Sequence, residues 1–427
     1  MDDDAGIRLL NPYAQTKVGN DAIFGWWARF QEAVASGADA VNGTIGALLE
    51  DDGSLAINQV VDAAIRQAPA VEIAAYAPLN GLPAFLDLAI TLALGEHRSQ
   101  LEQLGITTTA TATPGGSGAL YLAAANFSNR GDKVLLRDRH WGPYNGFLNG
   151  CGLSYATYPL LPSGDSSLPY VDIAGFKSEL EKLCQSQDKV MTWLNDPAHN
   201  PTGLSITAEG RMALLDAMME SATRNENVGH TLLLDAAYHL YAEEPHGWAE
   251  TIAEALDNGM PWPENFLITI SISLSKSHTI YGLRTGALVS LHPDSAVTER
   301  IGTVMGVTGR QTWSAAPRIA QYTVSTMHAD EQSAAAWAGE RDRLRDLLVT
   351  RRNALNEACS KLGVPLNPTM DGFFAWIESD EPTALAEACA EQEVYLVPLH
   401  GGVRIGLCAV PLSQIPRVAE ALANALA

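Results

Sequence analysis

The stretch SISLSKSHTIYGLRTGAL, residues 271–288, runs from an apolar segment through small hydroxyl residues to a lysine, and then to an arginine and a glycine. Its first residues complete the apolar run FLITISIS at 266–273, which predicts a buried strand. Lys276 follows this run, and lysine is seldom buried unless it is paired or has a chemical role. An amine that is desolvated beside other cations has a lowered pKa and can attack an aldehyde. The stretch alone leaves two interpretations open, a nucleophilic lysine or a solvated loop lysine.

Similar apolar runs precede this stretch and alternate with segments of helical pattern, such as the one from Pro83 to Leu94. These runs are KVLLR at 133–137, KVMTWL at 189–194 and HTLLLDAAY at 230–238. Short apolar runs that are bounded by turn residues and separated by helix-length segments are typical of buried parallel strands. We therefore predict an α/β fold for this part of the chain.

The C-terminal part of the chain has a different pattern. Large apolar residues recur at intervals of seven, four and seven, which predicts one face of a long helix; they are Trp337, Leu344, Leu348 and Leu355. After this helix, FFAWIE at 373–378, VYLVPL at 394–399 and a closing helix beyond Pro411 indicate a smaller α+β unit.

With 427 residues, the chain is long enough for two or three packed units. No internal repeat or low-complexity tract separates them, so we expect the units to be closely docked. The expected division is an N-terminal arm that also contributes to the small domain at 1–55, a large domain at 56–325 and a small C-terminal domain at 326–427.

The chain carries a formal charge of −22, from 27 Lys and Arg against 49 Asp and Glu. Such a charge repels nucleic acid and an anionic membrane surface, so we expect neither as a partner. The start MDDDAGIRLL lacks the basic and apolar regions of a signal peptide, and no apolar run approaches the roughly 18 residues of a spanning helix. We therefore expect a cytoplasmic protein.

The cysteines are odd in number, widely scattered and without a C-x-x-C pair; they are Cys151, Cys184, Cys359, Cys389 and Cys408. This pattern indicates neither a zinc site nor a disulfide framework. We expect buried free thiols and no metal site.

Several polar or aromatic residues near predicted strands are open to two interpretations. Asp235 ends an apolar run, where a carboxylate could simply cap the next helix. The segment HNPTG at 199–203 could be an ordinary turn, and the indole of Trp141 could be part of the core. Arg404 lies in the apolar context GGVRIGL, where an unpaired charge would be costly, so a bound anion is its natural partner.

The spacing of Lys276, Arg284 and Gly286 resembles the S-x-S-K-x-x-x-x-x-x-x-R-x-G signature of fold-type I aminotransferases, of the aspartate and aromatic type, which use pyridoxal phosphate. TPGGSGAL at 113–120 resembles the phosphate loop of the same family, although a tight turn alone would also explain its glycines. The likeness extends from VGNDAIFG at 18–25, which resembles the family's N-terminal arm, to the closing helix. It implies a large domain with a mostly parallel, seven-stranded sheet between helices, a smaller α+β domain, and a homodimer with shared active sites.

By this resemblance, Lys276 holds pyridoxal phosphate as a Schiff base and Arg284 binds the cofactor phosphate. Further contacts to the phosphate are expected from Gly116, Ser117, Ser273 and Ser275. Asp235 would pair with the protonated pyridine nitrogen, and Tyr238 and Asn200 would contact the phenolic oxygen of the ring.

The resemblance also implies substrate contacts. Arg404 would bind the α-carboxylate together with Asn200, while Trp141 would stack on the cofactor ring and, with Gly46, contact the substrate. Tyr76 would reach the phosphate of the partner subunit, and Arg310 would pair with the distal carboxylate of an acidic substrate.

One position departs from the family pattern. Tyr144 stands where many relatives carry a histidine that contacts the aspartate paired with the pyridine nitrogen. This departure leaves the hydrogen-bond network of Asp235 open.

The expected activity is a ping-pong transamination, in which Lys276 moves a proton between the substrate Cα and C4′ of the cofactor. The same fold also hosts lyases and decarboxylases, which remain the alternative. A cofactor-binding regulatory module is a further alternative, but it needs a helix-turn-helix segment and a linker, and the chain has neither.

The expected donors are aspartate, glutamate or an aromatic amino acid, with 2-oxoglutarate as the acceptor. Arg310 favours acidic substrates, whereas the positions that line the pocket by resemblance are apolar or small; they are Phe24, Ile45, Leu49, Ala75 and Ala315. These five residues could instead pack in the core. If they line the pocket, we expect dual use of acidic and aromatic substrates.

Overall fold

The computed structural model describes residues 9–17, 19, 22–161 and 171–427. Of the segment 18–25 that resembles an N-terminal arm, Val18, Asn20 and Asp21 lie outside the described residues.

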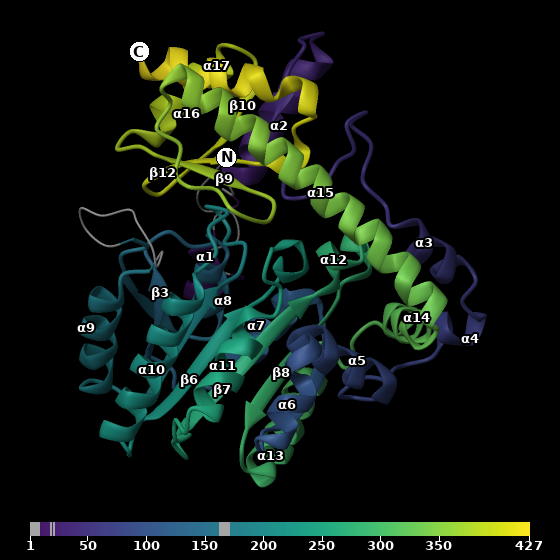
Figure 1. Ribbon diagram of the computed structural model, residues 1–427, viewed down its shortest axis with the longest axis vertical. Helices are drawn as coiled ribbons and strands as arrows, with labels where there is room; N and C mark the ends of the chain where they lie inside the picture. The colour runs from purple at the N-terminus through teal and green to yellow at the C-terminus, as the bar shows by residue number, and fades with distance from the viewer. Residues whose placement is uncertain (1–8, 18, 20–21, 162–170) are drawn as a thin grey trace.

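A seven-stranded sheet lies at the centre of the larger part of the molecule (Figure 1). Its order is β2-β8-β7-β6-β5-β3-β4; β8 is antiparallel to both of its neighbours and the other pairings are parallel. The strands are β2 (Thr107–Pro114), β3 (Lys133–Arg137), β4 (Ser154–Tyr158), β5 (Lys189–Asn195), β6 (Gly229–Asp235), β7 (Phe266–Ser273) and β8 (Thr285–His292). The expected mostly parallel, seven-stranded sheet is confirmed, and the four apolar runs of the sequence form β3, β5, β6 and β7.

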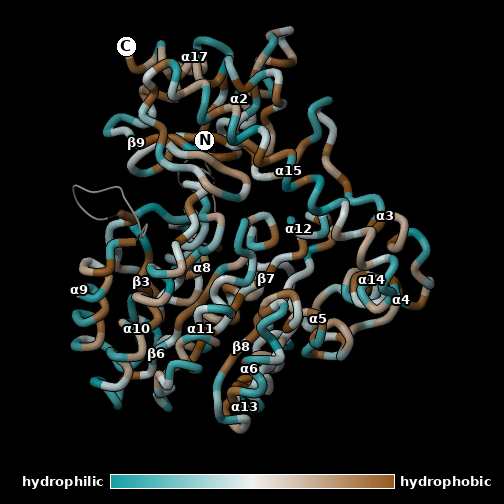
Figure 2. Tube along the Cα trace, in the orientation of Figure 1, coloured by the Kyte–Doolittle hydropathy of each residue, from teal (hydrophilic) through white to brown (hydrophobic). Residues whose placement is uncertain are grey.

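Helices cover both faces of this sheet, which explains why its strands are continuous apolar runs. In β6, Leu232 and Leu234 pack in one core with residues of α5, α9, α10 and α11, whereas Leu233 packs in another with residues of α7, α8 and α13. Figure 2 shows hydrophobic stretches along these central strands. The covering helices are α5 (Pro83–Leu94), α7 (Gly115–Asn126), α8 (Tyr144–Gly150), α9 (Ile173–Cys184), α10 (Ala208–Arg224), α11 (Gly247–Asp257) and α13 (Ser295–Thr312).

The smaller part is α+β, as expected. An antiparallel sheet has the order β11-β12-β9, formed by β11 (Val397–Leu399), β12 (Gly402–Ile405) and β9 (Ala375–Glu378). A second sheet pairs β1 (Val41–Asn42) in parallel with β10 (Val394–Tyr395), so the N-terminal segment packs with the C-terminal one. The helices of this part are α2 (Ala22–Ala35), α16 (Pro382–Ala390) and α17 (Ile415–Leu426).

Helix α15 (Glu331–Leu362) links the two parts (Figure 1). Its expected apolar face is confirmed, because Trp337, Leu344, Leu348 and Leu355 are all buried. Trp337 packs in the core of the large sheet, and Leu355 packs in the core of the smaller part. The remaining elements are α1 (Pro12–Gln15), α3 (Gln59–Arg66), α4 (Ala70–Ala74), α6 (Arg98–Gln103), α12 (Leu274–Ser277), α14 (Arg318–Ala329) and the 3₁₀ turns η1 (Gly95–His97), η2 (His239–Tyr241), η3 (Tyr281–Leu283), η4 (Leu407–Ala409) and η5 (Leu412–Gln414).

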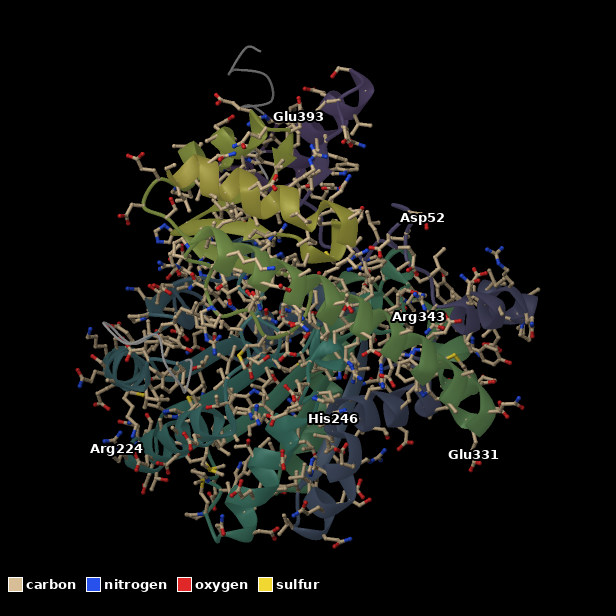
Figure 3. All side chains as sticks on the ribbon, turned by 45° about the horizontal axis from the view of Figure 1, so that its top comes forward. Asp52, Arg224, His246, Glu331, Arg343 and Glu393 are labelled. Carbon is tan, nitrogen blue, oxygen red and sulfur yellow. The ribbon has the colours of Figure 1, made fainter. Side chains whose placement is uncertain are left out.

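Charged side chains such as Arg224 and Glu331 lie at the periphery of the molecule (Figure 3). The five cysteines are free, but Cys151 and Cys184 are only partly buried, so the expectation of burial was wrong for these two. Within the described part of the chain, no cluster of His, Cys, Asp and Glu could hold a metal ion, and no helix is long and apolar enough to cross a membrane.

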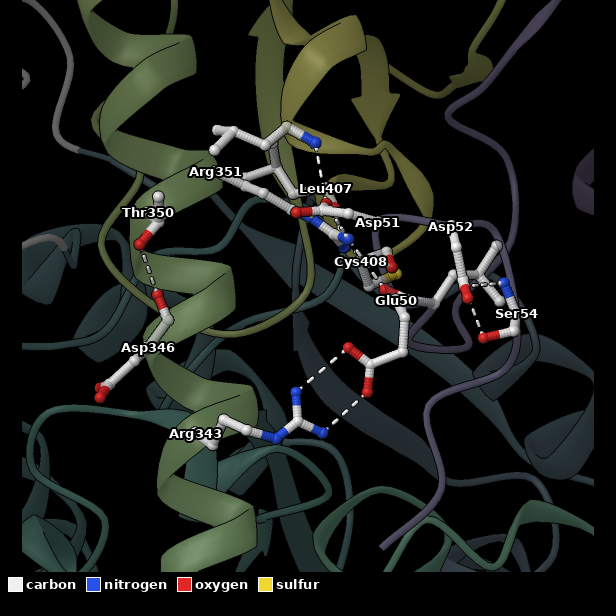
Figure 4. A network of polar contacts seen from close by, with 12 residues as sticks. Glu50, Asp51, Asp52, Ser54, Arg343, Asp346, Thr350, Arg351, Leu407 and Cys408 are labelled. Carbon is white, nitrogen blue, oxygen red and sulfur yellow. Dashed lines mark hydrogen bonds and ion pairs between the residues drawn. The ribbon is translucent and has the colours of Figure 1, made fainter.

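Two ion pairs fasten the N-terminal segment to α15 (Figure 4). The buried Arg351 donates to Asp51 at 2.7 Å and to the carbonyl oxygen of Leu49 at 2.9 Å. About two turns earlier on the same helix, Arg343 pairs with Glu50 at 2.7 Å. The segment that carries Gly46 is therefore held to the helix that joins the two parts.

Candidate active site

A cavity lies at the carboxyl ends of β5, β6 and β7, beside the start of α7. It is lined by Gly116, Ser117, Leu120, Trp141, Asn195, Asn200, Asp235, Ala237, Tyr238, Ser273, Lys276 and Arg284. Ligands in α/β sheets bind at this edge, because side chains that follow neighbouring parallel strands converge there. The structure thus brings together most of the site residues predicted from the sequence.

Lys276 lies in the short helix α12, directly after β7, and its Nζ is 5.2 Å from the centre of the Tyr238 ring. Burial lowers the pKa of the Lys276 amine to about 8; the carboxylate of Asp235 opposes this shift and the charge of Arg284 adds to it. The lowered pKa increases the fraction of the amine that is unprotonated near neutral pH, and the unprotonated amine is the form that attacks a carbonyl group.

Backbone and side-chain donors converge at the start of α7. Gly115 has φ +71°, and a Cβ atom there would lie only 2.6 Å from Nη2 of Arg284. A Cβ atom on Gly116 would lie 3.2 Å from Cβ of Ser273. Arg284 also donates from Nη1 to Oγ of Ser275 at 3.1 Å. The glycines leave room between a helix N-terminus and a guanidinium, and this arrangement suits a phosphate group.

Asp235, the last residue of β6, is buried, lines the cavity and accepts hydrogen bonds from two donors. Its Oδ2 accepts a hydrogen bond from the hydroxyl of Tyr144 at 2.6 Å, and its Oδ1 accepts from the backbone N–H of Ala237 at 3.2 Å. Burial raises the pKa of Asp235, and the hydrogen bond from Tyr144 is the largest opposing effect. Burial, and then the charge of Asp235, hold the pKa of Tyr144 well above its ordinary value, so its hydroxyl remains a donor.

Arg404, Asn200 and Tyr238 form a connected group between the two parts of the molecule. Asn200 donates from Nδ2 to the Tyr238 hydroxyl at 3.5 Å, and Arg404 donates from Nη1 to Oδ1 of Asn200 at 3.4 Å. Arg404 is buried, donates to the carbonyl oxygen of Thr44 and lies 4.5 Å above the centre of the Phe374 ring. These contacts place a buried cation next to the amide that lines the cavity.

Trp141 lines the same cavity as Asn200 and Tyr238, and Gly46 lies close to Phe374. Trp141 is half-buried, lines the cavity and packs edge-on against Tyr144, with ring centres 5.6 Å apart. A Cβ atom on Gly46 would lie 3.2 Å from the Phe374 ring, so the chain passes close over the residue that covers Arg404.

Two predicted residues lie away from the cavity of the single chain. Tyr76 is 87% exposed, and Arg310 is exposed and donates to Oγ of Ser314. Neither lines the cavity. None of the five expected apolar or small pocket residues is fully buried, so the structure does not support their packing in the core of one chain. These residues are Phe24, Ile45, Leu49, Ala75 and Ala315.

Sequence reasoning missed Asn195. This buried residue ends β5 and lies opposite Asp235 in the register of β5 and β6. It donates from Nδ2 to the carbonyl oxygen of Asp235 at 2.7 Å and accepts from the backbone N–H of Asn200 at 2.6 Å. A polar residue at the end of the run KVMTWL was the available signal, because ends of parallel strands meet at one edge.

Comparison with known proteins agrees with this geometry. The family model described as aminotransferase class I and II matches residues 38–422. The aromatic-amino-acid aminotransferase of Paracoccus denitrificans is 31% identical over 73% of this chain and 74% of its own length. The tyrosine aminotransferase of Klebsiella pneumoniae is 28% identical over 80% of this chain and 81% of its own length.

A solved structure, an aminotransferase from Anaerococcus prevotii, has a TM-score of 0.89 at 24% identity and covers 97% of this chain and 98% of its own. The fold-type I architecture inferred from the sequence is confirmed, and transamination is supported over the lyase and decarboxylase alternative. This chain belongs to the class I and II aminotransferases, a family that depends on pyridoxal phosphate.

Proposed function

We propose that the cavity holds pyridoxal 5′-phosphate through Lys276 and transfers the amino group of an acidic or aromatic L-amino acid to a 2-oxo acid. The observation that carries this proposal is one arrangement. An amine with a lowered pKa lies between a buried carboxylate, Asp235, and an anion cradle formed by Gly115, Gly116 and Arg284.

The residues present fit such a cofactor. Space is reserved between Gly115 and the Arg284 guanidinium, where a side chain would collide, and the hydroxyls of Ser117, Ser273 and Ser275 are close by. Asp235 would hold a protonated ring nitrogen, Tyr238 and Asn200 would bind the phenolic oxygen, and Trp141 would cover a ring face. When bound, pyridoxal phosphate supplies a ring that draws electrons away from the bonds at the substrate Cα.

In this proposal, Arg404 binds the α-carboxylate of the substrate and Asn200 shares it. Both residues are buried and in contact, so they fix the direction of the Cα–H bond before it breaks. With the cofactor bound, the free and unprotonated Nζ atom of Lys276 would take the proton from Cα of the amino donor, and in the second half of the reaction it would give a proton to Cα of the substrate formed from the 2-oxo acid.

The substrate range and a shared site are further parts of this proposal. The named relatives include aromatic-amino-acid, tyrosine and aspartate aminotransferases, which supports both aromatic and acidic donors. Tyr76 and Arg310 are exposed on one chain, which supports a homodimer in which each residue completes the site of the partner.

The test is spectroscopic. The purified protein should be yellow, and borohydride should bleach its absorbance irreversibly and leave a modification that peptide mapping places on Lys276. Lys276→Ala should lack the modification and transaminate no amino acid. Full turnover by Lys276→Ala would contradict the assignment.

A further inference from the structure

The carboxylate of Asp235 has an unusual set of neighbours. Among the residues that the structure describes, Tyr144 is the one side chain that donates a hydrogen bond to it, at 2.6 Å. Its other oxygen accepts from the N–H of Ala237, and the amide of Asn195 binds the Asp235 carbonyl rather than the carboxylate. The hydrogen bond from the Tyr144 phenol is the largest of the effects that favour the charged form of this buried carboxylate, ahead of the charge of Lys276 and the N–H of Ala237.

Neighbouring aromatic side chains hold the ring of Tyr144 in the orientation in which its hydroxyl donates to Asp235. Tyr144 is buried at the start of α8 and packs edge-on against Trp141 and Trp193, with ring centres 5.6 and 5.1 Å apart. Because packing already fixes the ring, the hydrogen bond to Asp235 costs little additional side-chain freedom.

No imidazole bonds to Asp235 in the described structure. His140 lies parallel to the Tyr144 ring, with ring centres 6.3 Å apart, but both of its ring nitrogens contact other groups. Nδ1 contacts the carbonyl oxygen of Arg137 at 2.9 Å, and Nε2 contacts Oδ1 of Asn145 at 3.1 Å. The other groups whose charge acts on the Tyr144–Asp235 pair are Arg137, Tyr238 and Lys276.

We propose that Tyr144 is a positioning residue that holds Asp235 ionised and fixed with a donor whose own charge does not change near neutral pH. This inference rests on the proposed binding of pyridoxal phosphate. Asp235 then presents the same negative charge to the ring nitrogen across the neutral range. An imidazole in the place of Tyr144 would change its charge near pH 6.5 and alter that hold.

The experiment measures the dissociation constant of pyridoxal phosphate for the cofactor-free protein, by the change in absorbance, between pH 5.5 and 9. It compares the wild type with Tyr144→Phe, Tyr144→His and a control, Tyr158→Phe. Tyr158 is also fully buried, at the end of β4, and packs on Phe176 instead of Asp235. The dissociation constant of each variant is expressed as a ratio to that of the wild type, which cancels the titration of the cofactor.

For Tyr144→Phe we expect the dissociation constant to rise about tenfold to a hundredfold, the effect of losing a hydrogen bond to a buried charge. The ratio should grow as the pH falls, because an Asp235 without its donor takes up a proton more readily. For Tyr144→His we expect a step in the ratio between about pH 6 and 7. For Tyr158→Phe, the ratio of dissociation constants to the wild type should stay near one at every pH.

Different outcomes contradict the role of Tyr144 and the proposed function. If the wild type binds pyridoxal phosphate but Tyr144→Phe matches Tyr158→Phe throughout, the role of Tyr144 is wrong and the proposed function stands. A flat Tyr144→His ratio would also overturn it. If the wild type binds no pyridoxal phosphate at any pH, the proposed function itself is wrong.

Discussion

Arg139 donates a hydrogen bond from Nη2 to Oε2 of Glu378 at 2.7 Å, and this ion pair joins the loop that carries Trp141 to strand β9. Glu378 also accepts from Nε1 of Trp376 at 2.9 Å, and Trp376 lies opposite Arg404 in the register of β9 and β12. One series of contacts therefore connects both sides of the proposed substrate site.

Breaking this ion pair should weaken substrate binding more than it slows chemistry. We expect Arg139→Ala and Glu378→Gln each to lower kcat/KM several-fold, mainly through KM, with a coupling energy of about 1 kcal/mol in a double-mutant cycle. Glu387→Gln is the matched control, since Glu387 pairs with Arg29 at 2.6 Å in the small part of the molecule. Strictly additive effects of the two variants would show that the contact carries no coupling.

Much of this fold follows from local sequence, and the reason lies in burial. The strand β7 occupies the predicted residues 266–273, because a strand covered on both faces must be apolar throughout. Arg139 and Glu378, in contrast, are separated by 239 residues, and nothing near either one indicates the other. The hydrogen bond between Asn195 and Asp235 likewise depends on the register of two strands. The antiparallel direction of β8 depends on which strands it pairs with, and the local sequence does not indicate either.

The phosphate cradle gives a prediction based on space. Gly115→Ala should raise the dissociation constant of pyridoxal phosphate more than tenfold, because the new Cβ would lie 2.6 Å from the Arg284 guanidinium. Gly131→Ala is the control: Gly131 also has a positive φ, +97°, but nothing lies within 4 Å of an added Cβ. Both variants should lose about 1–2 kcal/mol of stability from the strained backbone, while only the first should lose cofactor affinity. Equal affinities in equilibrium titrations would place the phosphate elsewhere.

The lowered pKa of Lys276 predicts a pH dependence for the cofactor-free protein. The initial rate of pyridoxal phosphate binding should rise with pH with a midpoint near the Lys276 pKa of about 8, as the amine loses its proton. Asp235→Asn should move this midpoint lower, because the Asp235 carboxylate favours the protonated amine. A midpoint that is unchanged in Asp235→Asn would show that the two groups do not interact.

The lowered pKa of Lys276 also makes the stability of the cofactor-free protein depend on pH. An unfolded chain keeps Lys276 protonated up to its ordinary pKa of 10.5, whereas the folded chain releases that proton near 8. The unfolded state therefore binds more protons between these values, so the cofactor-free protein should gain stability as the pH rises through this window and lose it as the pH falls. Lys276→Met should lack this contribution, which denaturant unfolding at several pH values would measure.

The substrate range depends on Arg310, which lies near the end of α13 and is exposed on the single chain. If the partner subunit receives this guanidinium, it would pair with the distal carboxylate of aspartate or glutamate, whereas an aromatic side chain would need no such partner. The measurement is kcat/KM for aspartate, glutamate, phenylalanine and tyrosine with 2-oxoglutarate, in the wild type and in Arg310→Ala.

Removing Arg310 should cost acidic substrates a charge-assisted pair of roughly 2–5 kcal/mol and should affect aromatic substrates far less. Arg300→Ala is a suitable control, because Arg300 is another exposed arginine of α13, and it should change neither class. Equal losses for both classes would make Arg310 a structural residue. If the wild type has no activity with any aromatic donor, the enzyme is specific for dicarboxylates. The partly buried apolar residues Ile45 and Leu49 then do not accept an aromatic ring.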